Sequence, residues 1–529
     1  MRDFQLPGRS PVMAMNGMAA TSHPLATEAA VACLRSGGSA ADAAVKAAAV
    51  LCVVEPHMTG LGGDGFAIVG TPDGEIHGLN GSGRSPAALT LDRFLNRGDA
   101  EVMPEHADAV TVPGVVACWQ ALLDRFGRFD LGRLLEPAIS FAENGFPVAP
   151  RVAWDWAGQA ARLRGNAAAA RHYLPGGAAP AAGDVHRLPA LAATLRKIAR
   201  LGAAGFYQGE IAADIAATVR AAGGVMTEAD LAGMAAEWVA PVTSRYRGIE
   251  VAELPPNGQG ITALIILNIM ECLEAHALDI NGSERAHLML EAARLAYACR
   301  DAFICDPARM RVTVEALVSK AYAEIEARRF DPTRRLADVT PAPVPKASTV
   351  YLTVVDRDGL AVSLINSIYF LFGSSIATDE SGILLQNRGS CFVVDPDHPN
   401  CVGPAKRPMH TIIPGFVLRD GRPVMPFGVM GGAYQAMGHA QFVSNWHDYG
   451  LDPQAALDGP RLFWTDDPDV IAAERGVSPA TVAGLRARGH VVVEAASPHG
   501  GGQAIEIDHA RGVLIGGSDP RKDGLALGY

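Results

Sequence analysis

Apolar residues in the first two thirds of the chain recur at spacings of three and four residues, which is the period of an amphipathic helix. This pattern predicts helices over residues 24–35 and 38–54 and through most of residues 113–305. Within the last stretch, the sequence TEAD at residues 227–230 resembles a capping box and marks a helix start. Residues 66–70 form a short apolar run before a turn and predict a strand. The first two thirds are therefore expected to be rich in helix.

The pattern changes at the sequence TPAPVPKAS, residues 340–348, a proline-rich connector that is expected to be extended and exposed. After it, apolar residues alternate with a period of two. Residues 349–355 and 360–368 are rich in β-branched side chains and are joined by the hairpin signal DRDG. Further strands are predicted around residues 411–418 and 503–507, with a helix over about 433–449 between them. The last third is expected to be rich in strand.

Composition narrows the class of protein. The chain has 529 residues, 49% of them hydrophobic, which is enough to bury a large core. A net charge of −11 argues against nucleic acid or an anionic membrane as a partner. The eight cysteines form no CxxC pair, and no apolar run has the length of a signal peptide or a membrane span. These features predict a cytoplasmic α/β protein.

Two common motifs are excluded by their context. GLGGDG at residues 60–65 matches the dinucleotide-binding pattern GxGxxG, but here a helix precedes the glycines and a strand follows them, which reverses the required order. Close approach of two backbones in a buried turn explains these glycines better. The histidines form no HxxxH or HExxH pattern, so no metal site is predicted, and no GxSxG sequence supports a hydrolase elbow.

Thr349 opens a predicted strand directly after the connector. A threonine hydroxyl is a poor nucleophile unless a base lies within hydrogen-bond reach, and its own α-amine, with a pKa of about 7.7–8.0, could serve. That amine exists only if the peptide between Ser348 and Thr349 is cut. The hypothesis is self-cleavage, with the Thr349 hydroxyl attacking the Ser348 carbonyl. The alternative is an ordinary strand threonine.

Gly431 and Gly432 stand directly before the predicted helix at 433–449. Successive glycine N–H groups at a helix N-terminus can point at a developing oxyanion. A plain glycine turn is the alternative, and the sequence alone does not decide between them.

Several blocks, in this order along nearly the whole chain, resemble the γ-glutamyltranspeptidase family of N-terminal-nucleophile hydrolases. They are GLGGDGF (60–66), VPG (112–114), PPNGQG (255–260), HLMLEAARLAY (287–297), TVYLTVVDRDG (349–359), ESGILL (380–385), KRP (406–408), GG (431–432) and SDPR (518–521). The resemblance implies a four-layer αββα sandwich of the α/β (α+β) class. It also implies two autoproteolytic fragments, a large subunit 1–348 and a small subunit 349–529, which pair as a heterodimer and could pair again as a dimer of heterodimers. No metal or organic cofactor is implied.

The resemblance also assigns the reacting groups. Thr349 falls on the nucleophile, Ser367 on a second hydroxyl that hydrogen-bonds it, and Gly431 and Gly432 on the oxyanion-hole pair.

The substrate pocket departs from the family pattern. Where the family holds the substrate amine with Asp, Asn and Gln, this chain has Cys391, Tyr369 and Arg388. The family arginine that grips the α-carboxylate aligns with Ser82, with Arg84 two residues away, and the two serines after KRP are replaced by His410 and Thr411.

These changes predict a different substrate. Loss of a carboxylate at Cys391 and gain of Arg388 disfavour an ammonium group, whereas an arginine suits a carboxylate close to the scissile amide. Tyr369 should shorten the cavity, and His410 and Tyr369 could supply hydrogen bonds. Arg388 could instead form only a structural ion pair.

Family members without a glutamyl pocket include cephalosporin acylases and an oxamate amidohydrolase of purine catabolism. The expected activity is therefore hydrolysis, rather than transfer, of a small carboxylate-bearing amide through an acyl-enzyme, with oxamate converted to oxalate and ammonia as the best candidate. Three alternatives remain open: a γ-glutamyltransferase or glutathione hydrolase, a cephalosporin-acylase-like amidase, and an uncleaved homologue that serves as a binding or scaffold protein.

Overall fold

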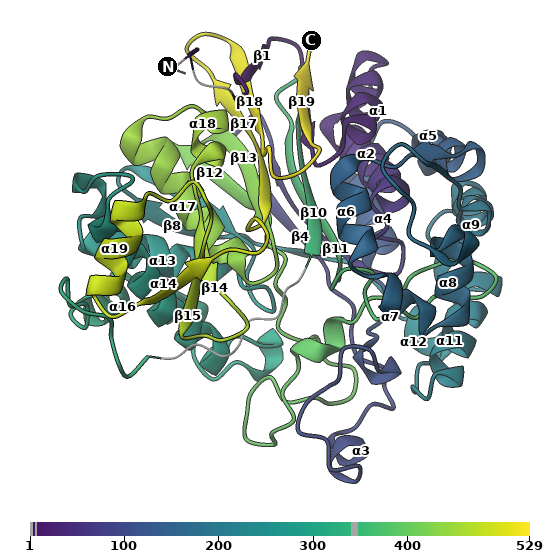
Figure 1. Ribbon diagram of the computed structural model, residues 1–529. Coiled ribbons are helices and arrows are strands. Elements are labelled where there is room, and N and C mark those ends of the chain that lie inside the picture. The colour runs from purple at the N-terminus through teal and green to yellow at the C-terminus, as the bar shows by residue number, and fades with distance from the viewer. Residues whose placement is uncertain (1–3, 6–7, 340–347) are drawn as a thin grey trace.

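The computed structural model describes residues 4–5, 8–339 and 348–529. Within them lie two antiparallel seven-stranded sheets, packed face to face between two layers of helices (Figure 1). Sheet A comprises, in spatial order, β1 (Val12–Ala14), β18 (Val513–Ser518), β17 (Gly501–Asp508), β13 (Arg422–Met430), β12 (Gly415–Arg419), β9 (Ile249–Glu253) and β8 (Val242–Tyr246). Sheet B comprises β19 (Leu525–Gly528), β2 (Met18–Thr21), β10 (Ser348–Val355), β11 (Ala361–Tyr369), β3 (Asp64–Gly70), β4 (Ile76–Gly81) and β7 (Glu237–Val239).

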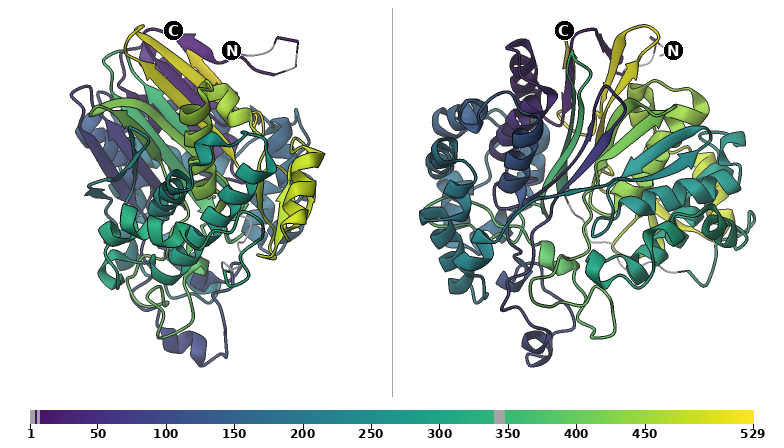
Figure 2. Two further views of the ribbon diagram at one scale, coloured as in Figure 1. Left: turned by 90° about the vertical axis from the view of Figure 1, so that its left-hand side faces the viewer. Right: turned by 180° about the vertical axis from the view of Figure 1, so that it is seen from behind.

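The two helical layers are visible on opposite sides of the sheets in Figure 2. Over sheet B lie α1 (Pro24–Arg35), α2 (Ala40–Val54), α4 (Val115–Phe126), α5 (Leu131–Asn144), α6 (Pro150–Ala157), α7 (Ala160–Arg164), α8 (Ala167–Tyr173), α9 (Pro189–Leu201), α10 (Ala204–Tyr207), α11 (Glu210–Ala221) and α12 (Glu228–Ala232). Over sheet A lie α13 (Gly260–Cys272), α14 (Ser283–Phe303), α15 (Val314–Leu317), α16 (Lys320–Ala327), α17 (Tyr434–Tyr449), α18 (Pro453–Asp458) and α19 (Pro479–Ala487).

Smaller elements lie outside these four layers. They are the short helix α3 (Leu91–Leu95), the hairpin β5 (Phe146–Pro147) with β6 (Val185–His186), and the sheet of β14 (Leu462–Trp464), β15 (Val470–Ala473) and β16 (Val491–Glu494). The αββα sandwich expected from the resemblance is confirmed.

The periodicity predicted many elements closely. The helices expected over 24–35 and 433–449 are α1 and α17, and the expected hairpin is β10–β11. The capping box at Thr227 is present, with the Asp230 side chain accepting from the Thr227 backbone. The connector predicted over 340–348 lies outside the described residues, apart from Ser348.

The stretch 113–305 is mostly helical, as expected, but it also contains β7, β8 and β9, so the first two thirds contribute strands to both sheets. One prediction was wrong. The strand expected over 411–418 begins only at Gly415. Before it, the backbone of His410 bonds to the loop at Asn257 and Gln259, and Pro414 lacks the N–H that a ladder needs.

The register of sheet B brings the predicted reacting groups to one end of the sheet. Ser348 pairs with Tyr369 and Val350 with Asn366, and the register shift between these pairs falls at Thr349. On the other side of β11, Ser367 pairs with Asp64. The start of β10, the end of β11 and the start of β3 therefore meet.

The glycines of the GLGGDG segment allow this meeting. A Cβ on Gly63 would lie 2.3 Å from the Ser367 carbonyl oxygen, and one on Gly62 would lie 2.0 Å from the Leu384 carbonyl oxygen. A Cβ on Gly60, in contrast, would meet nothing closer than 3.8 Å. The glycine pattern thus has a packing role at Gly62 and Gly63, as predicted.

Gly63→Ala should destabilise the fold by at least about 1–3 kcal/mol, because the added methyl group overlaps the β11 backbone. Gly60→Ala, in the same turn, is the matched control and should cost less than about 0.5 kcal/mol. Thermal unfolding of the two variants beside the parent protein checks this; equal stability of Gly60→Ala and Gly63→Ala would contradict it.

Candidate functional site

Thr349 is buried, with 1% of its surface exposed. Its Oγ1 donates to Ser367 Oγ at 3.3 Å and accepts from Gln435 Nε2 at 3.4 Å. Ser367 Oγ also accepts from the Tyr369 backbone N–H at 2.8 Å. The hydroxyl predicted as the nucleophile therefore lies in a network of oriented donors and acceptors at the junction of β10, β11 and α17.

Arg388, in the 3₁₀ turn Arg388–Cys391, is fully buried beside this pair of hydroxyls. Its Nη1 donates to Thr411 Oγ1 at 2.7 Å and its Nη2 to Ser367 Oγ at 3.3 Å. Its guanidinium lies 4.1 Å from the centre of the Tyr369 ring. Among the residues that the structure describes, no carboxylate oxygen lies within 4.0 Å of Arg388, and its Nε has no acceptor. A buried cation without an anion is suited to binding one.

Tyr369 forms the wall beneath this guanidinium. Its backbone adopts φ 77°, a left-handed conformation that is uncommon for a residue with a side chain. Burial and the neighbouring Cys391 thiol raise the pKa of the Tyr369 phenol well above its usual value. The phenol is therefore neutral and occupies space beside Arg388 as a hydrogen-bonding group without charge.

His410 and Asp64 form a buried pair on the other side of Arg388. His410 Nε2 lies 3.0 Å from Asp64 Oδ2, while His410 Nδ1 accepts from the Ile412 N–H at 3.3 Å, so the Nε2 atom carries the proton. Burial, and then the charge of Arg388, lower the pKa of His410 to about 3. His410 is thus a neutral imidazole and adds no second positive charge beside Arg388.

Asp64 is held by donors from three directions. Its Oδ1 accepts from the backbone N–H groups of Gly83 and Gly114, each at 3.1 Å, and from Gln386 Nε2 at 2.9 Å. Because these bonds join segments far apart in sequence, Asp64 fixes the position of His410 and, with it, one wall of the site.

Gly431 and Gly432 lie before the first turn of α17, with φ values of 124° and 62° that favour glycine. Two side chains hold this turn in place. Gln259 Nε2 donates to the Gly432 carbonyl at 3.0 Å and to the Thr411 carbonyl at 2.7 Å. The Tyr297 hydroxyl donates to the Ala433 carbonyl. Since Gln435 in the same turn reaches Thr349, the two glycines stand at the end of α17 that faces Thr349.

The Arg84 side chain does not join this group of residues and instead forms two ion pairs. Its Nη1 is 3.2 Å from Asp306 Oδ2 and its Nη2 is 3.6 Å from Glu237 Oε1, and 42% of its side chain is exposed. Ser82 is buried, and its Oγ accepts from Asn257 Nδ2 at 3.0 Å. The structure thus brings Thr349, Ser367, Tyr369, Arg388, Cys391, Thr411 and His410 together and leaves Arg84 in a separate cluster.

Sequence reasoning missed several residues of the site. Asp64, Gln259 and Tyr297 lie in the blocks GLGGDGF, PPNGQG and HLMLEAARLAY, so the signal for them was present. Gln435 lies in none of these blocks, and only the packing of α17 against β10 reveals its bond to Thr349.

His287, Glu291 and His490 form the one group in the described part of the chain whose spacing could suit a metal ion. Their ligand atoms already have partners: His287 Nδ1 lies 2.8 Å from His490 Nε2, and Glu291 Oε1 lies 2.9 Å from Arg294 Nη1. Burial, and then the neighbouring His287 and Arg294, lower the pKa of His490 to about 3. The positive charge of Arg294 disfavours a cation here.

Known proteins resemble the whole chain. The family profile described as Gamma-glutamyltranspeptidase matches residues 26–529. The chain is 37% identical to the glutathione hydrolase-like YwrD proenzyme of Bacillus subtilis, covering 98% of this chain and 99% of the relative. It is 36% identical to the oxamate amidohydrolase proenzyme of Klebsiella pneumoniae, covering 97% and 98%. The crystal structure of cephalosporin acylase from Bacillus halodurans superposes with a TM-score of 0.93 at 40% identity, covering 100% and 99%. Among the described residues, no helix is both long and apolar enough to span a membrane.

The burial of His410 predicts an acid-dependent loss of stability. Its folded pKa of about 3 lies below its ordinary value of 6.5, so the unfolded chain takes up a proton that the folded chain does not. This contribution is fully present above pH 6.5 and is lost as the pH falls toward 3. Lowering the pH from 7 to 5 should cost about 2 kcal/mol through His410 alone.

His410→Asn should remove this part of the pH dependence, whatever its effect on stability at pH 7. His447→Asn, at a partly exposed histidine on α17, is the control and should keep the parent's pH dependence. Urea unfolding at the two pH values measures the difference; an unchanged pH dependence in His410→Asn would overturn the assignment of a neutral buried imidazole.

Proposed function

The chain belongs to the gamma-glutamyltranspeptidase family, whose members hydrolyse amide bonds, and we propose that it is a self-processed N-terminal-threonine amidohydrolase. The proposed substrate is a short amide that bears a carboxylate, and oxamate is the best candidate. The observation that carries the proposal is the buried Arg388, which has no carboxylate partner among the described residues and is joined to Thr349 through a single hydroxyl, that of Ser367.

Processing supplies the base. In the proposed step, Thr349 Oγ1 attacks the Ser348 carbonyl carbon, the acyl group passes from nitrogen to oxygen, and water then hydrolyses the ester. The products are fragments 1–348 and 349–529, and the second begins with a free α-amine on Thr349. Proenzyme is part of the name of both relatives above, which supports such a step.

The interleaving of the two proposed fragments would keep them together after cleavage. In sheet B, β10 and β11 lie between β2 and β3, and in sheet A, β12 pairs with β9. Separating the fragments would break backbone ladders on both sides of the hairpin and expose the core between the sheets. A heterodimer is therefore the proposed working form.

Hydrolysis then needs only groups at this junction. The Thr349 hydroxyl attacks the substrate carbonyl while its α-amine takes the proton, and the N–H groups of Gly431 and Gly432 stabilise the oxyanion. The amine returns the proton to the departing ammonia. Water, activated by the same amine, attacks the acyl-enzyme and releases the acid.

The position of the charge favours a short substrate. A carboxylate bound to Arg388 and Thr411 would place its next carbon near Ser367 and Thr349, so the amide carbonyl should be adjacent to the carboxylate, as in oxamate. A γ-glutamyl group needs an anion for its ammonium, and the position expected to supply one is Cys391. The Tyr369 ring further limits the length of the pocket.

Thr349→Ala should give one band on a denaturing gel, whereas the parent protein should give two. Thr349→Ser, which keeps a hydroxyl, is the matched control and should still be cleaved, more slowly. N-terminal sequencing of the smaller band should read TVYLT. A single band from catalytically active parent protein would exclude both self-processing and the free amine.

Arg388→Gln should lower kcat/KM for ammonia release from oxamate at least about 100-fold, because a bidentate charged contact is lost. Arg388→Lys keeps the charge without the planar pair of donors and should lose less. Both variants must first show two bands, so that a processing defect is not mistaken for a binding defect. Retention of parent activity on oxamate by Arg388→Gln, or preference of the parent for a γ-glutamyl anilide, would contradict the proposed substrate.

A further inference from the structure

A cavity of about 630 Å³ lies between α14, α17, α18, the strand β14 and the start of α19. None of the residues assigned to the candidate site lines it. Its wall includes both ends of α18 and the middle of α17, and its volume is in the range of sites for small organic ligands. The side chains that carry the argument are Arg285, Ala286, Met289, Asn445, Leu462 and Val477.

Arg285 gives this cavity a charge. Only 3% of the residue is exposed, and among the described residues no carboxylate lies within 4.0 Å of its guanidinium. Its Nη2 donates to Ser444 Oγ at 3.0 Å and Asn445 Oδ1 at 2.9 Å, while Nη1 has the single Ile280 carbonyl at 3.3 Å and Nε has no acceptor. The nearby carboxylate of Asp448 reaches Arg285 only through the Ser444 hydroxyl, which donates to Asp448 Oδ2 at 2.7 Å, and Asp448 already pairs with Arg247. A buried cation whose direct bonds are all to neutral groups is only partly compensated and favours an anion.

The remaining lining restricts that anion. Ala286, Met289, Leu462 and Val477 contribute apolar surface, so most of the ligand should be apolar. Asp452 and Asp458 also line the cavity and disfavour negative charge anywhere but at Arg285. We propose that this cavity binds a monocarboxylate with an apolar body, its carboxylate on Arg285.

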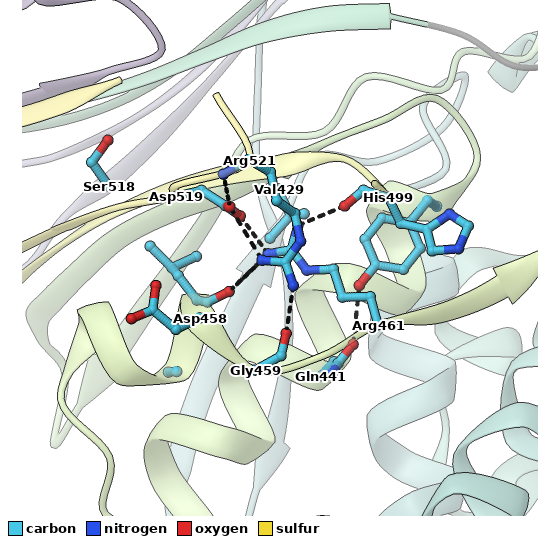
Figure 3. Close-up of polar contacts among 12 residues, drawn as sticks. Val429, Gln441, Asp458, Gly459, Arg461, His499, Ser518, Asp519 and Arg521 are labelled. Atoms are coloured by element: carbon cyan, nitrogen blue, oxygen red, sulfur yellow. Dashed lines mark hydrogen bonds and ion pairs between the residues drawn. The ribbon is translucent and has the colours of Figure 1, made fainter. Parts of the chain in front are cut away.

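The cavity wall is preformed. Arg521 Nη2 donates to the Gly459 carbonyl at 2.8 Å, and Arg461 Nη2 is 2.6 Å from Asp519. Figure 3 shows the buried Arg461 and the half-buried Arg521 with Asp458 and Gly459. Gln441 Nε2 donates to the Pro460 carbonyl at 2.9 Å. These bonds fix the segment that follows α18, so a ligand need not order it.

The helices α14 and α17, which line this cavity, also contact the candidate site. Gln441 Oε1 accepts from the Tyr434 hydroxyl at 3.0 Å, and Tyr434 opens α17 two residues after Gly432. On α14, the helix that carries Arg285, the Tyr297 hydroxyl donates to the Ala433 carbonyl. A carboxylate in this cavity therefore touches the two helices that hold the proposed oxyanion turn.

The test is calorimetric titration of the whole protein with 3-phenylpropionate and with 3-phenylpropan-1-ol, which has the same body without the charge. The acid should bind saturably with a Kd below about 1 mM and at least about tenfold more tightly than the alcohol. Arg285→Met should weaken the acid at least about tenfold and leave the alcohol unchanged. Arg245→Met, on the exposed face of β8, is the control for loss of one positive charge and should bind like the parent.

Ala455→Phe, which fills the cavity from α18 and retains Arg285, should abolish binding of both compounds and decides the matter if Arg285→Met does not fold. Absence of saturable binding to the parent up to about 10 mM would overturn the proposal. Equal affinity for acid and alcohol, or parent-like binding by Ala455→Phe, would overturn it too. Activity on oxamate is not the readout, so failure here is independent of the proposed function.

Discussion

The buried guanidinium of Arg388, which has no carboxylate partner in the part of the chain that the structure describes, is the constraint on which the rest of the site depends. Arg388 is held by Thr411 and Ser367 and by the face of Tyr369, all neutral groups. Such a charge is costly to bury, and the unpaired cation becomes an advantage only when a substrate supplies the missing anion. It also contributes to keeping His410 neutral, so no second positive charge competes for that anion.

The fold places this charge beside the proposed nucleophile, Thr349, through the register of sheet B. The register shift at Thr349, the pairing of Ser367 with Asp64, and the close approach at Gly63 bring three strand ends to one point. The first turn of α17, a helix that covers the other sheet, also contacts this junction, because Gln435 Nε2 donates to Thr349 Oγ1. Because each sheet contains strands of both proposed fragments, the site is completed only by their joint packing.

Much of this could be predicted from local pattern, and the failures have physical causes. The β10–β11 hairpin and Thr349 at its start follow from a period of two after a proline-rich segment. The strands β7 to β9 were missed because strands of only three to five residues carry little periodic signal. Arg84 was a candidate by proximity in sequence, yet its side chain pairs with Asp306 and Glu237, residues distant in sequence. Likewise, the absence of a carboxylate partner for Arg388 among the described residues is a property of tertiary packing.

The central claim is that the carboxylate held by Arg388 must be adjacent to the scissile amide. Initial rates of ammonia release from oxamate, malonamate and succinamate, which place none, one and two methylene groups between carboxylate and amide, test it most directly. The account predicts that kcat/KM is highest for oxamate and falls with each methylene group. A rate that rises with chain length would show that Arg388 anchors a longer substrate and would contradict the assignment.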